Sequence, residues 1–187
     1  MTPGRSPRCS PDRRVEHRAD GRPSSFEAAI PGLGALLKDA VDGGASVNFV
    51  SGVTREQTEG WWTARTARVA DGTITVFVAR DDGGRIVGST LIERSVNPNS
   101  PHRAEIGKVI VHRSMRRQGI AKALMQAAED QARAEGRWML ILDTVSGSAA
   151  AALYESLGWV TVGTIPAYAL NVAGEPEPAT YYYKDLR

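Results

Sequence analysis

Apolar residues recur at two different spacings along this chain, and the spacing predicts where helices and strands lie. Between Leu33 and Val41 they recur every three or four positions, and the pair of glycines that follows is typical of a helix end. A second helix is predicted from Thr54, because Thr-Arg-Glu-Gln has the residues of a capping box, and it is expected to stop near Asp71. The folded part of the chain therefore begins with two helices.

Runs rich in β-branched residues predict the strands. Residues 73–80 and 85–94 flank an Asp-Asp-Gly-Gly turn, and this combination is a strong hairpin signal. One mixed sheet covered by helices is the fold that this order of elements predicts, and the first strand-helix-strand passage should place its two strands parallel. The later elements are a strand (105–112), a helix (120–135), a strand (138–144), a short helix (148–157) and two strands (159–165 and 179–186).

Positive charge is concentrated at the N-terminal end. The whole chain has a formal net charge of +2, but residues 1–23 contain six arginines against three carboxylates. This segment is rich in proline and serine and nearly free of large apolar residues, so it cannot bury enough surface to offset the entropy of ordering. We expect residues 1–24 to form a disordered tail and residues 25–187 to form one domain. A nucleic-acid-binding arm is disfavoured, because such arms usually accompany a basic domain.

Other classes of function are disfavoured by what the sequence lacks. Its single cysteine, Cys9, cannot form an internal disulfide, and the three histidines lack the helical spacing of a metal-binding pair, so no metal site is expected. No apolar run approaches the roughly 18 residues that a membrane span needs, and the N-terminus lacks the apolar core of a secretory signal. The expectation is a cytoplasmic protein that binds neither membrane nor nucleic acid.

A short basic segment, Arg116 to Met125 (RRQGIAKALM), joins a predicted strand to a predicted helix. The N–H groups in the first turn of a helix have no partners within the helix, and the helix dipole favours anions there. Gly119 would let a ligand approach the backbone, and Ala121 keeps the next turn small. Arg113, Arg116 and Arg117 add charge that suits phosphate oxygens. These residues alone leave two interpretations open: an anion site or a solvated basic turn.

Two segments of the chain resemble the GNAT superfamily of acetyl-CoA-dependent N-acetyltransferases. Residues 109–124 resemble its motif A through Arg116, Gly119 and Ala121, and residues 152–160 (ALYESLGWV) resemble its motif B. The resemblance implies a single-domain α/β (α+β) fold with a mixed, mostly antiparallel sheet of six to seven strands and about four flanking helices. It also implies that acetyl-CoA is the cosubstrate.

The resemblance further implies which residues hold acetyl-CoA. The two parallel strands at the centre of the sheet are expected to splay apart. Main-chain groups of the first strand would then reach the pantetheine arm and the acetyl carbonyl, while backbone amides at the start of the next helix hold the diphosphate. Motif B often has an asparagine at the position of Gly147, and Ser146 or Ser148 is expected to substitute for it. The implied cofactor-binding residues are Val109, Ile110, Val111, Arg116, Arg117, Gln118, Gly119, Ile120, Ala121, Lys122 and Ser148.

Among GNAT families, the chain is most similar to the tabtoxin resistance acetyltransferases. The similarity runs in patches from about Leu36 to Leu186, and Gly147 belongs to this narrower pattern. The patches include GGASVNF (43–49), RAEIGKVIV (103–111), LDTVSGSAAAALY (142–154) and TYYYKDL (180–186).

Acetyl transfer from a thioester to an amine needs a base for the ammonium, a donor for the oxyanion and an acid for the leaving thiolate, but no enzyme nucleophile. Glu105 opens a predicted strand and Asp143 ends the neighbouring one, where apolar neighbours would raise the pKa of a carboxyl group. The resemblance points to both carboxylates, without deciding which is the base, and to Tyr154 as the acid. Each has a structural alternative: Glu105 as a surface partner of Arg103, Asp143 as a helix cap, and Tyr154 as a core aromatic.

We therefore expect an N-acetyltransferase that moves an acetyl group from acetyl-CoA directly to the amine of a small molecule, either amino-acid-like or antibiotic- or toxin-like. Phe49 and Tyr168 are expected to line the acceptor pocket. Two alternatives stay open: a non-catalytic CoA-binding sensor, and an acetyltransferase that acts on a protein amine. The sequence does not determine the identity of the acceptor or the oligomeric state, a homodimer included.

Overall fold

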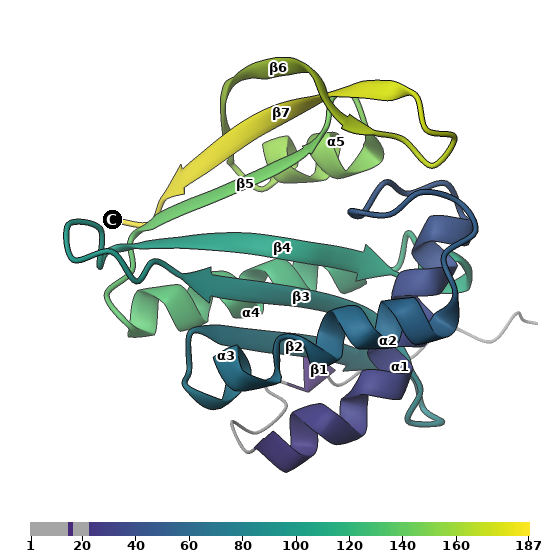
Figure 1. The fold of residues 1–187 in the computed structure, drawn as a ribbon. Coiled ribbons are helices and arrows are strands. Elements are labelled where there is room, and N and C mark those ends of the chain that lie inside the picture. The colour runs from purple at the N-terminus through teal and green to yellow at the C-terminus, as the bar shows by residue number, and fades with distance from the viewer. Residues whose placement is uncertain (1–14, 17–22) are drawn as a thin grey trace, which may run out of the picture.

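The computed structural model describes residues 15–16 and 23–187, which fold around one seven-stranded sheet (Figure 1). The strand order is β1-β2-β3-β4-β5-β7-β6, and each neighbouring pair is antiparallel except β4 and β5. The strands are β1 (Val15–Glu16), β2 (Ile74–Arg80), β3 (Ile86–Arg94), β4 (Arg103–Val111), β5 (Met139–Val145), β6 (Val160–Leu170) and β7 (Pro176–Asp185).

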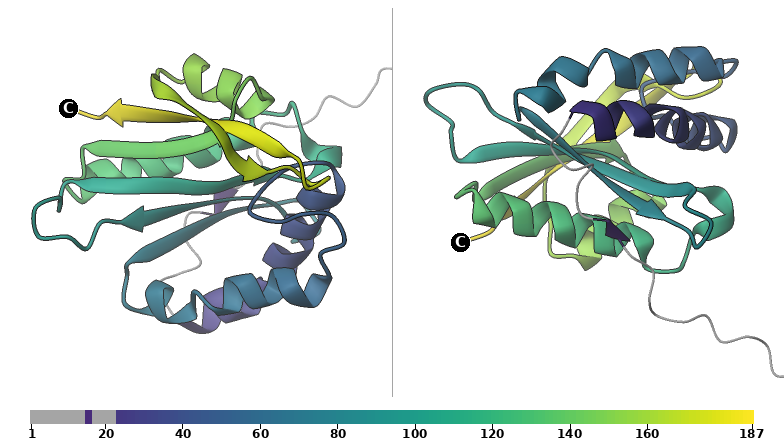
Figure 2. Two further views of the ribbon diagram at one scale, coloured as in Figure 1. Left: turned by 45° about the horizontal axis from the view of Figure 1, so that its top comes forward. Right: turned by 90° about the horizontal axis from the view of Figure 1, so that it is seen from below.

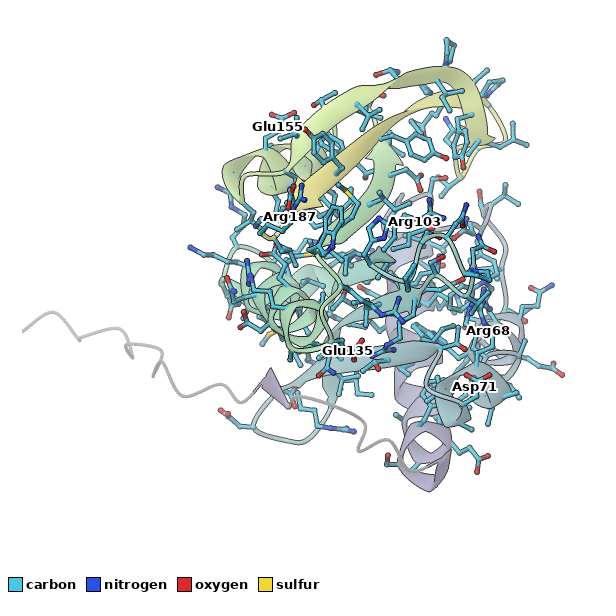
Figure 3. The ribbon with its side chains drawn as sticks, turned by 90° about the vertical axis from the view of Figure 1, so that its left-hand side faces the viewer. Arg68, Asp71, Arg103, Glu135, Glu155 and Arg187 are labelled. Atoms are coloured by element: carbon cyan, nitrogen blue, oxygen red, sulfur yellow. The ribbon has the colours of Figure 1, made fainter. Side chains whose placement is uncertain are left out.

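Helices cover both faces of the sheet. Figure 2 shows α1, α2 and α3 on one face and α4 and α5 on the other. Figure 3 shows the same division in the side chains, with Arg68 and Asp71 on the side of α3, and Glu135 and Glu155 on the side of α4 and α5. The helices are α1 (Pro23–Asp42), α2 (Arg55–Thr63), α3 (Thr66–Ala70), α4 (Ile120–Ala134) and α5 (Ala149–Ser156), with a 3-10 turn η1 (Arg113–Met115) before α4.

Each face of the sheet has its own apolar core. Successive side chains of β2 point to opposite faces of the sheet and so enter different cores. Phe77 belongs to the core beneath α4, while Val76 and Val78 belong to the core beneath α1, α2 and α3. Leu124 of α4 and Trp62 of α2 are fully buried in these two cores. The sheet is therefore packed between two layers of helices, each with its own core.

The parallel pair at the centre of the sheet is joined over only three residue pairs. Arg103 lies opposite Met139, and the last pair is Glu105 with Ile141. Beyond this pair β4 and β5 diverge, as Figure 1 shows, while each strand remains paired to its outer neighbour. One edge of each strand is thus left without a strand partner at the carboxyl ends of a parallel pair, where open α/β sheets bind ligands.

The predicted fold class is confirmed: one domain, a mixed and mostly antiparallel sheet, and a splayed parallel pair, although five α-helices flank it instead of about four. The capping box at Thr54 forms as predicted. The Gln57 N–H donates to Thr54 Oγ1 at 3.2 Å, and the Thr54 N–H donates to Gln57 Oε1 at 2.8 Å. Among residues 23–187, no helix is long and apolar enough to cross a membrane.

Two predicted boundaries were wrong. The helix that begins after Thr54 breaks at Ala64 and Arg65, so α3 replaces its last turns. The strand predicted over residues 159–165 ends too early, because β6 continues to Leu170 and the loop to β7 covers only residues 171–175. The register against β7 shifts between Ile165 and Ala169, and this irregularity accommodates Pro166 within the strand.

The predicted tail is described only in part. Val15–Glu16 pair with β2 as a two-residue strand, and α1 already begins at Pro23, so these positions differ from the disorder predicted through residue 24. The other tail positions, Cys9 included, lie outside the described residues.

Candidate active site

The first turn of α4 begins where β4 ends, beside the diverging strands. Gly119 is the N-cap residue of α4 with φ +80°, and no side chain caps this helix. The first-turn N–H groups therefore remain available to an anion. Arg117 also has positive φ, at +63°, so the backbone curls immediately before the helix. The predicted diphosphate residues Gln118, Ile120, Ala121 and Lys122 lie in or next to this turn.

The arginines near this turn have different roles. Arg116 and Arg117 are exposed beside it and add positive charge. Arg113, also expected to suit phosphate, is instead used within the protein. Its Nε donates to Asp39 Oδ1 at 2.9 Å, and its N–H donates to Asp39 Oδ2 at 3.0 Å. Because Asp39 belongs to α1, this pair anchors the basic loop to the opposite layer of helices.

The predicted pantetheine-binding edge is the free edge of β4. Ile110 and Val111 pair with β3 on one side, and no strand adjoins the other side after β5 diverges. Arg116 Nε donates to the Val111 carbonyl at 3.3 Å, so one acceptor on this segment already has a donor. Val109, Ile110 and Val111 thus lie on a stretch of β4 whose second edge has no strand partner among the described residues, and their contact with pantetheine stays a prediction.

Ser148 has a structural role in the protein. Its Oγ accepts the Ala151 N–H at 3.2 Å as the N-cap of α5, and the Ser146 hydroxyl lies 2.7 Å from Thr180 Oγ1. Each hydroxyl therefore already has one hydrogen-bond partner within the protein and keeps further hydrogen-bonding capacity. Assignment of Ser148 to the cofactor stays a prediction.

Glu105 and Asp143 lie on one face of the sheet. Cross-strand partners share a face, and Glu93, Glu105 and Ile141 follow one another across β3, β4 and β5. Asp143 is two residues beyond Ile141 and so points to the same side. Glu93 in turn is two residues beyond Leu91, which is buried beneath α1. This acidic face therefore continues the sheet surface that α1, α2 and α3 cover.

Both carboxyl groups have perturbed acidity. Burial raises the pKa of Glu105, and the negative charges of Glu93 and Asp143 raise it further. Burial also raises the pKa of Asp143, while nearby Lys108 opposes the rise. Both side chains are exposed to solvent on one side, and the protein around them removes part of the water that would stabilise the charged carboxylates. Raised carboxyl pKa values at an open site fit general-base catalysis.

Tyr154 lies on the opposite face, on α5, and is 4% exposed. Its ring centroid is 6.1 Å from those of Trp159 and Tyr182. Burial raises the pKa of its phenol, and the charge of Asp143 raises it further, so the hydroxyl carries its proton at neutral pH. No residue in the described part of the chain forms a hydrogen bond with this hydroxyl, which leaves it available to a ligand.

The two predicted acceptor residues lie at opposite borders of the acidic face. Phe49 is half-buried against the core beneath α1, and Tyr168 is 46% exposed on β6. The Tyr168 hydroxyl accepts a hydrogen bond of 2.6 Å from Tyr181, which lies opposite Asp143 on β7. The loop that contains Phe49 contacts the β6–β7 turn through the Ser51 N–H, which donates to the Val172 carbonyl at 2.8 Å.

Lys108 is a residue of this face that the sequence analysis missed. In the first half of β4 the even-numbered residues Ala104 and Ile106 face the core beneath α4, but in the second half the odd-numbered residues Val109 and Val111 face it. The alternation of side chains between the two faces therefore shifts by one residue. A register shift against β3 marks the slip, and Lys108 has φ +51°. This bulge turns Lys108 onto the acidic face. The broken spacing of apolar residues in AEIGKVIV was the signal in the sequence.

Gly119→Ala is expected to weaken acetyl-CoA binding by about tenfold, because φ +80° strains any residue with a Cβ by roughly 1 to 3 kcal/mol. A Cβ at this position meets no atom within 4 Å, so strain is the only cost. Gly84→Ala is the matched control, since Gly84 also has φ +80° and open space around its Cβ but lies in the β2–β3 turn. Calorimetric titration should show weaker binding for Gly119→Ala alone, and equal binding by the two variants would contradict the assignment of the α4 turn.

Comparison with known proteins agrees with this geometry. A model of the acetyltransferase (GNAT) family matches residues 47–159, from the loop after α1 to the end of the α5 motif. The chain belongs to the GNAT acetyltransferase family. It is 32% identical over 96 residues to N-alpha-acetyltransferase 30 of Schizosaccharomyces pombe, covering 51% of this chain and 63% of that protein. The chain thus spans less than two thirds of the length of this curated relative.

Solved structures share the whole fold. An N-acetyltransferase from Staphylococcus aureus Mu50 superposes with a TM-score of 0.72 at 19% identity, covering 86% of this chain and 94% of that one. A protein from Salmonella typhimurium, solved with its cofactor acetyl-CoA, superposes with a TM-score of 0.68 at 21% identity, covering 86% and 90%. The matches extend across both layers of helices and establish the fold of residues outside the region of the family model.

Proposed function

We propose that this protein is an N-acetyltransferase that moves the acetyl group of acetyl-CoA directly to the amine of a small molecule, amino-acid-like or antibiotic- or toxin-like. One observation carries the proposal. The gap between the diverging strands β4 and β5 lies between the N-terminus of α4, which no described side chain caps, and the carboxylates of Glu105 and Asp143, which form no ion pair with a described residue. The sequence patches similar to the tabtoxin resistance acetyltransferases support the small-molecule class of acceptor.

The residues at the divergence fit acetyl-CoA. Backbone N–H groups at Gly119, Ile120 and Ala121 would hold the diphosphate, because this helix start has no cap of its own. The free edge of β4 at Val109 to Val111 would hold the amide-containing arm. When bound, acetyl-CoA supplies the acetyl group as a thioester.

Side chains on both faces of the sheet carry out the proton transfers of the reaction. Glu105 accepts the proton of the acceptor ammonium, because three influences raise its pKa: burial, Glu93 and Asp143. Asp143 attracts the ammonium to the face. Tyr154 donates its proton to the departing sulfur from the α5 side, and main-chain N–H groups of β4 stabilise the oxyanion. No side-chain nucleophile is required.

An acetyltransferase that acts on a protein amine is the second candidate, and the local similarity to N-alpha-acetyltransferase 30 favours it. A thiol-release assay with acetyl-CoA distinguishes the candidates when free amino acids, other small amines and short peptides with free N-termini are compared. Turnover restricted to peptides supports the second candidate. Acetyl-CoA binding without turnover of any amine supports a CoA-binding sensor, and no binding at submillimolar concentration refutes all three.

A further inference from the structure

Two cationic side chains meet at Trp61 on the border of the acidic face. The Arg65 guanidinium carbon lies 3.2 Å from the centroid of the Trp61 ring, and Lys108 Nζ lies 4.5 Å from it. Trp61 itself is held edge-on against the fully buried Trp62, with 4.8 Å between the ring centroids. Trp61 and Arg65 lie one helical turn apart, in α2 and at its junction with α3, whereas Lys108 comes from the distant β4 bulge. The fold therefore brings the second cation to this ring.

Neither cation has a carboxylate partner within the described part of the chain. Arg65 donates to the Trp61 carbonyl at 2.7 Å, and Lys108 donates to Asn48 Oδ1. Both of these acceptors are neutral. Arg68, one turn further along α3, shows the ordinary alternative, because it pairs with Glu93 at 2.7 Å.

Two half-buried cations that lie close together repel each other. Burial lowers the pKa of Lys108 to about 8 and the charge of Arg65 lowers it further, while Asp143 and Glu105 only partly oppose this shift. Burial likewise lowers the pKa of Arg65. An unpaired charge away from water costs free energy, and a ligand that carries the opposite charge would remove that cost.

Strained backbone holds Lys108 in this position. Lys108 has φ +51°, and its hydrogen-bond partner Asn48 has φ +72°. Left-handed conformations at residues other than glycine cost about 1 to 3 kcal/mol each and persist where the surrounding structure enforces them, most often at functional sites. Asparagine adopts this conformation readily, so the β4 bulge at Lys108 is the strained position, and it fixes the Lys108 ammonium beside Asn48 and Trp61.

The carboxylates of the acidic face complete the arrangement. Glu105 and Asp143 act electrostatically on Lys108, so they lie close to it, yet neither forms an ion pair with it or with any other described residue. The face thus offers unpaired negative groups beside unpaired positive groups. Such a surface is complementary to a molecule that carries an ammonium and an anion a few ångströms apart.

We propose that Arg65 and Lys108 form an anion subsite that binds the carboxylate of the acceptor while Glu105 and Asp143 receive its amine. The acceptor is accordingly a zwitterion, a free amino acid or an analogue of one. A peptide N-terminus lacks the adjacent carboxylate and is disfavoured. This inference rests on the proposed acetyltransferase function and adds its determinant of specificity.

Matched acceptors test the subsite: the twenty common amino acids and several β-amino acids, each compared with its carboxamide in the thiol-release assay. Wild-type kcat/KM is expected to be at least about tenfold higher for the acids. Lys108→Met and Arg65→Met should each lower kcat/KM for the acids by about 10- to 100-fold through KM, with little change for the amides. Lys108→Arg should restore most of the preference, because it keeps the charge.

Arg55→Met is the control, since Arg55 lies on α2 but pairs with Glu59 and contacts α1 through the Pro31 carbonyl. It removes the same charge and should leave the preference intact. Equal use of acids and amides by the wild type, or equal losses for both in Lys108→Met, overturns the subsite while leaving acetyl transfer in place. No turnover of any amine despite acetyl-CoA binding overturns the proposed function and the subsite together.

Discussion

Replacing Tyr154 by phenylalanine is expected to lower kcat by about 10²- to 10³-fold, while acetyl-CoA binding changes little. A positioned general acid contributes on the order of 10²- to 10⁴-fold to a rate. The Tyr154 phenol is buried and fully protonated at neutral pH, since burial raises its pKa and the nearby Asp143 raises it further. Loss of the hydroxyl therefore removes a proton donor and not a charge.

The substitution should leave folding nearly intact. The Tyr154 ring packs against Trp159 and Tyr182, and phenylalanine keeps these ring contacts. The hydroxyl has no hydrogen-bond partner among the described residues, so its removal leaves no buried group without a partner. Single-turnover acetyl transfer and thermal unfolding, measured on the same preparation, separate the catalytic effect from a structural one.

Tyr182→Phe is the matched control for Tyr154→Phe. Tyr182 is 2% exposed in the same aromatic cluster, but its hydroxyl donates to Glu155 Oε1 at 3.2 Å and so has a structural partner. Its loss should cost about 1 kcal/mol of stability and leave kcat within a few-fold of the wild type. Equal kcat values for Tyr154→Phe and the wild type would show that Tyr154 is a core aromatic with an idle hydroxyl.

The parts of the fold that sequence predicts best are those fixed by local chemistry. The hairpin of β2 and β3 follows from its Asp-Gly turn, α2 from the capping box at Thr54, and the parallel pair from the strand-helix-strand order that ends in β5. In each case a few adjacent residues determine the backbone. Local patterns therefore also placed the helix start next to Gly119. The anion site expected at this helix start stays a prediction.

Residues whose roles depend on distant partners were predicted poorly. Arg113 has the same composition cues as Arg116, but Asp39 on α1, 74 residues earlier, takes its guanidinium. Lys108 reaches the acidic face only because of a bulge between strands. Tertiary contacts assign these side chains, and no local pattern in a single sequence records them.

The pH dependence of the reaction provides the strongest test of which carboxylate is the base. Glu105→Gln is expected to lower kcat/KM by about 10²- to 10⁴-fold and to abolish the acidic limb of its pH profile. In the wild type that limb should lie above the ordinary range of a glutamate, because burial, Glu93 and Asp143 all raise the Glu105 pKa. Asp143→Asn removes one of these negative charges, so the acidic limb of the pH profile of this variant should move to lower pH.

The pH dependence of the free energy of unfolding provides an independent test of the role of Glu105. A carboxyl pKa raised in the folded state means that the native protein binds its proton more tightly than the unfolded chain does, so ionisation of Glu105 opposes folding as pH rises through that window. Glu105→Gln should therefore be no less stable than the wild type at neutral pH. It should also lose less stability than the wild type as the pH rises above the ordinary range of a glutamate, which is about 4.3. An inactive variant of undiminished stability identifies a catalytic group, since a structural carboxylate would show the opposite. If Asp143→Asn instead loses the acidic limb while Glu105→Gln retains it, Asp143 is the base and Glu105 attracts the ammonium.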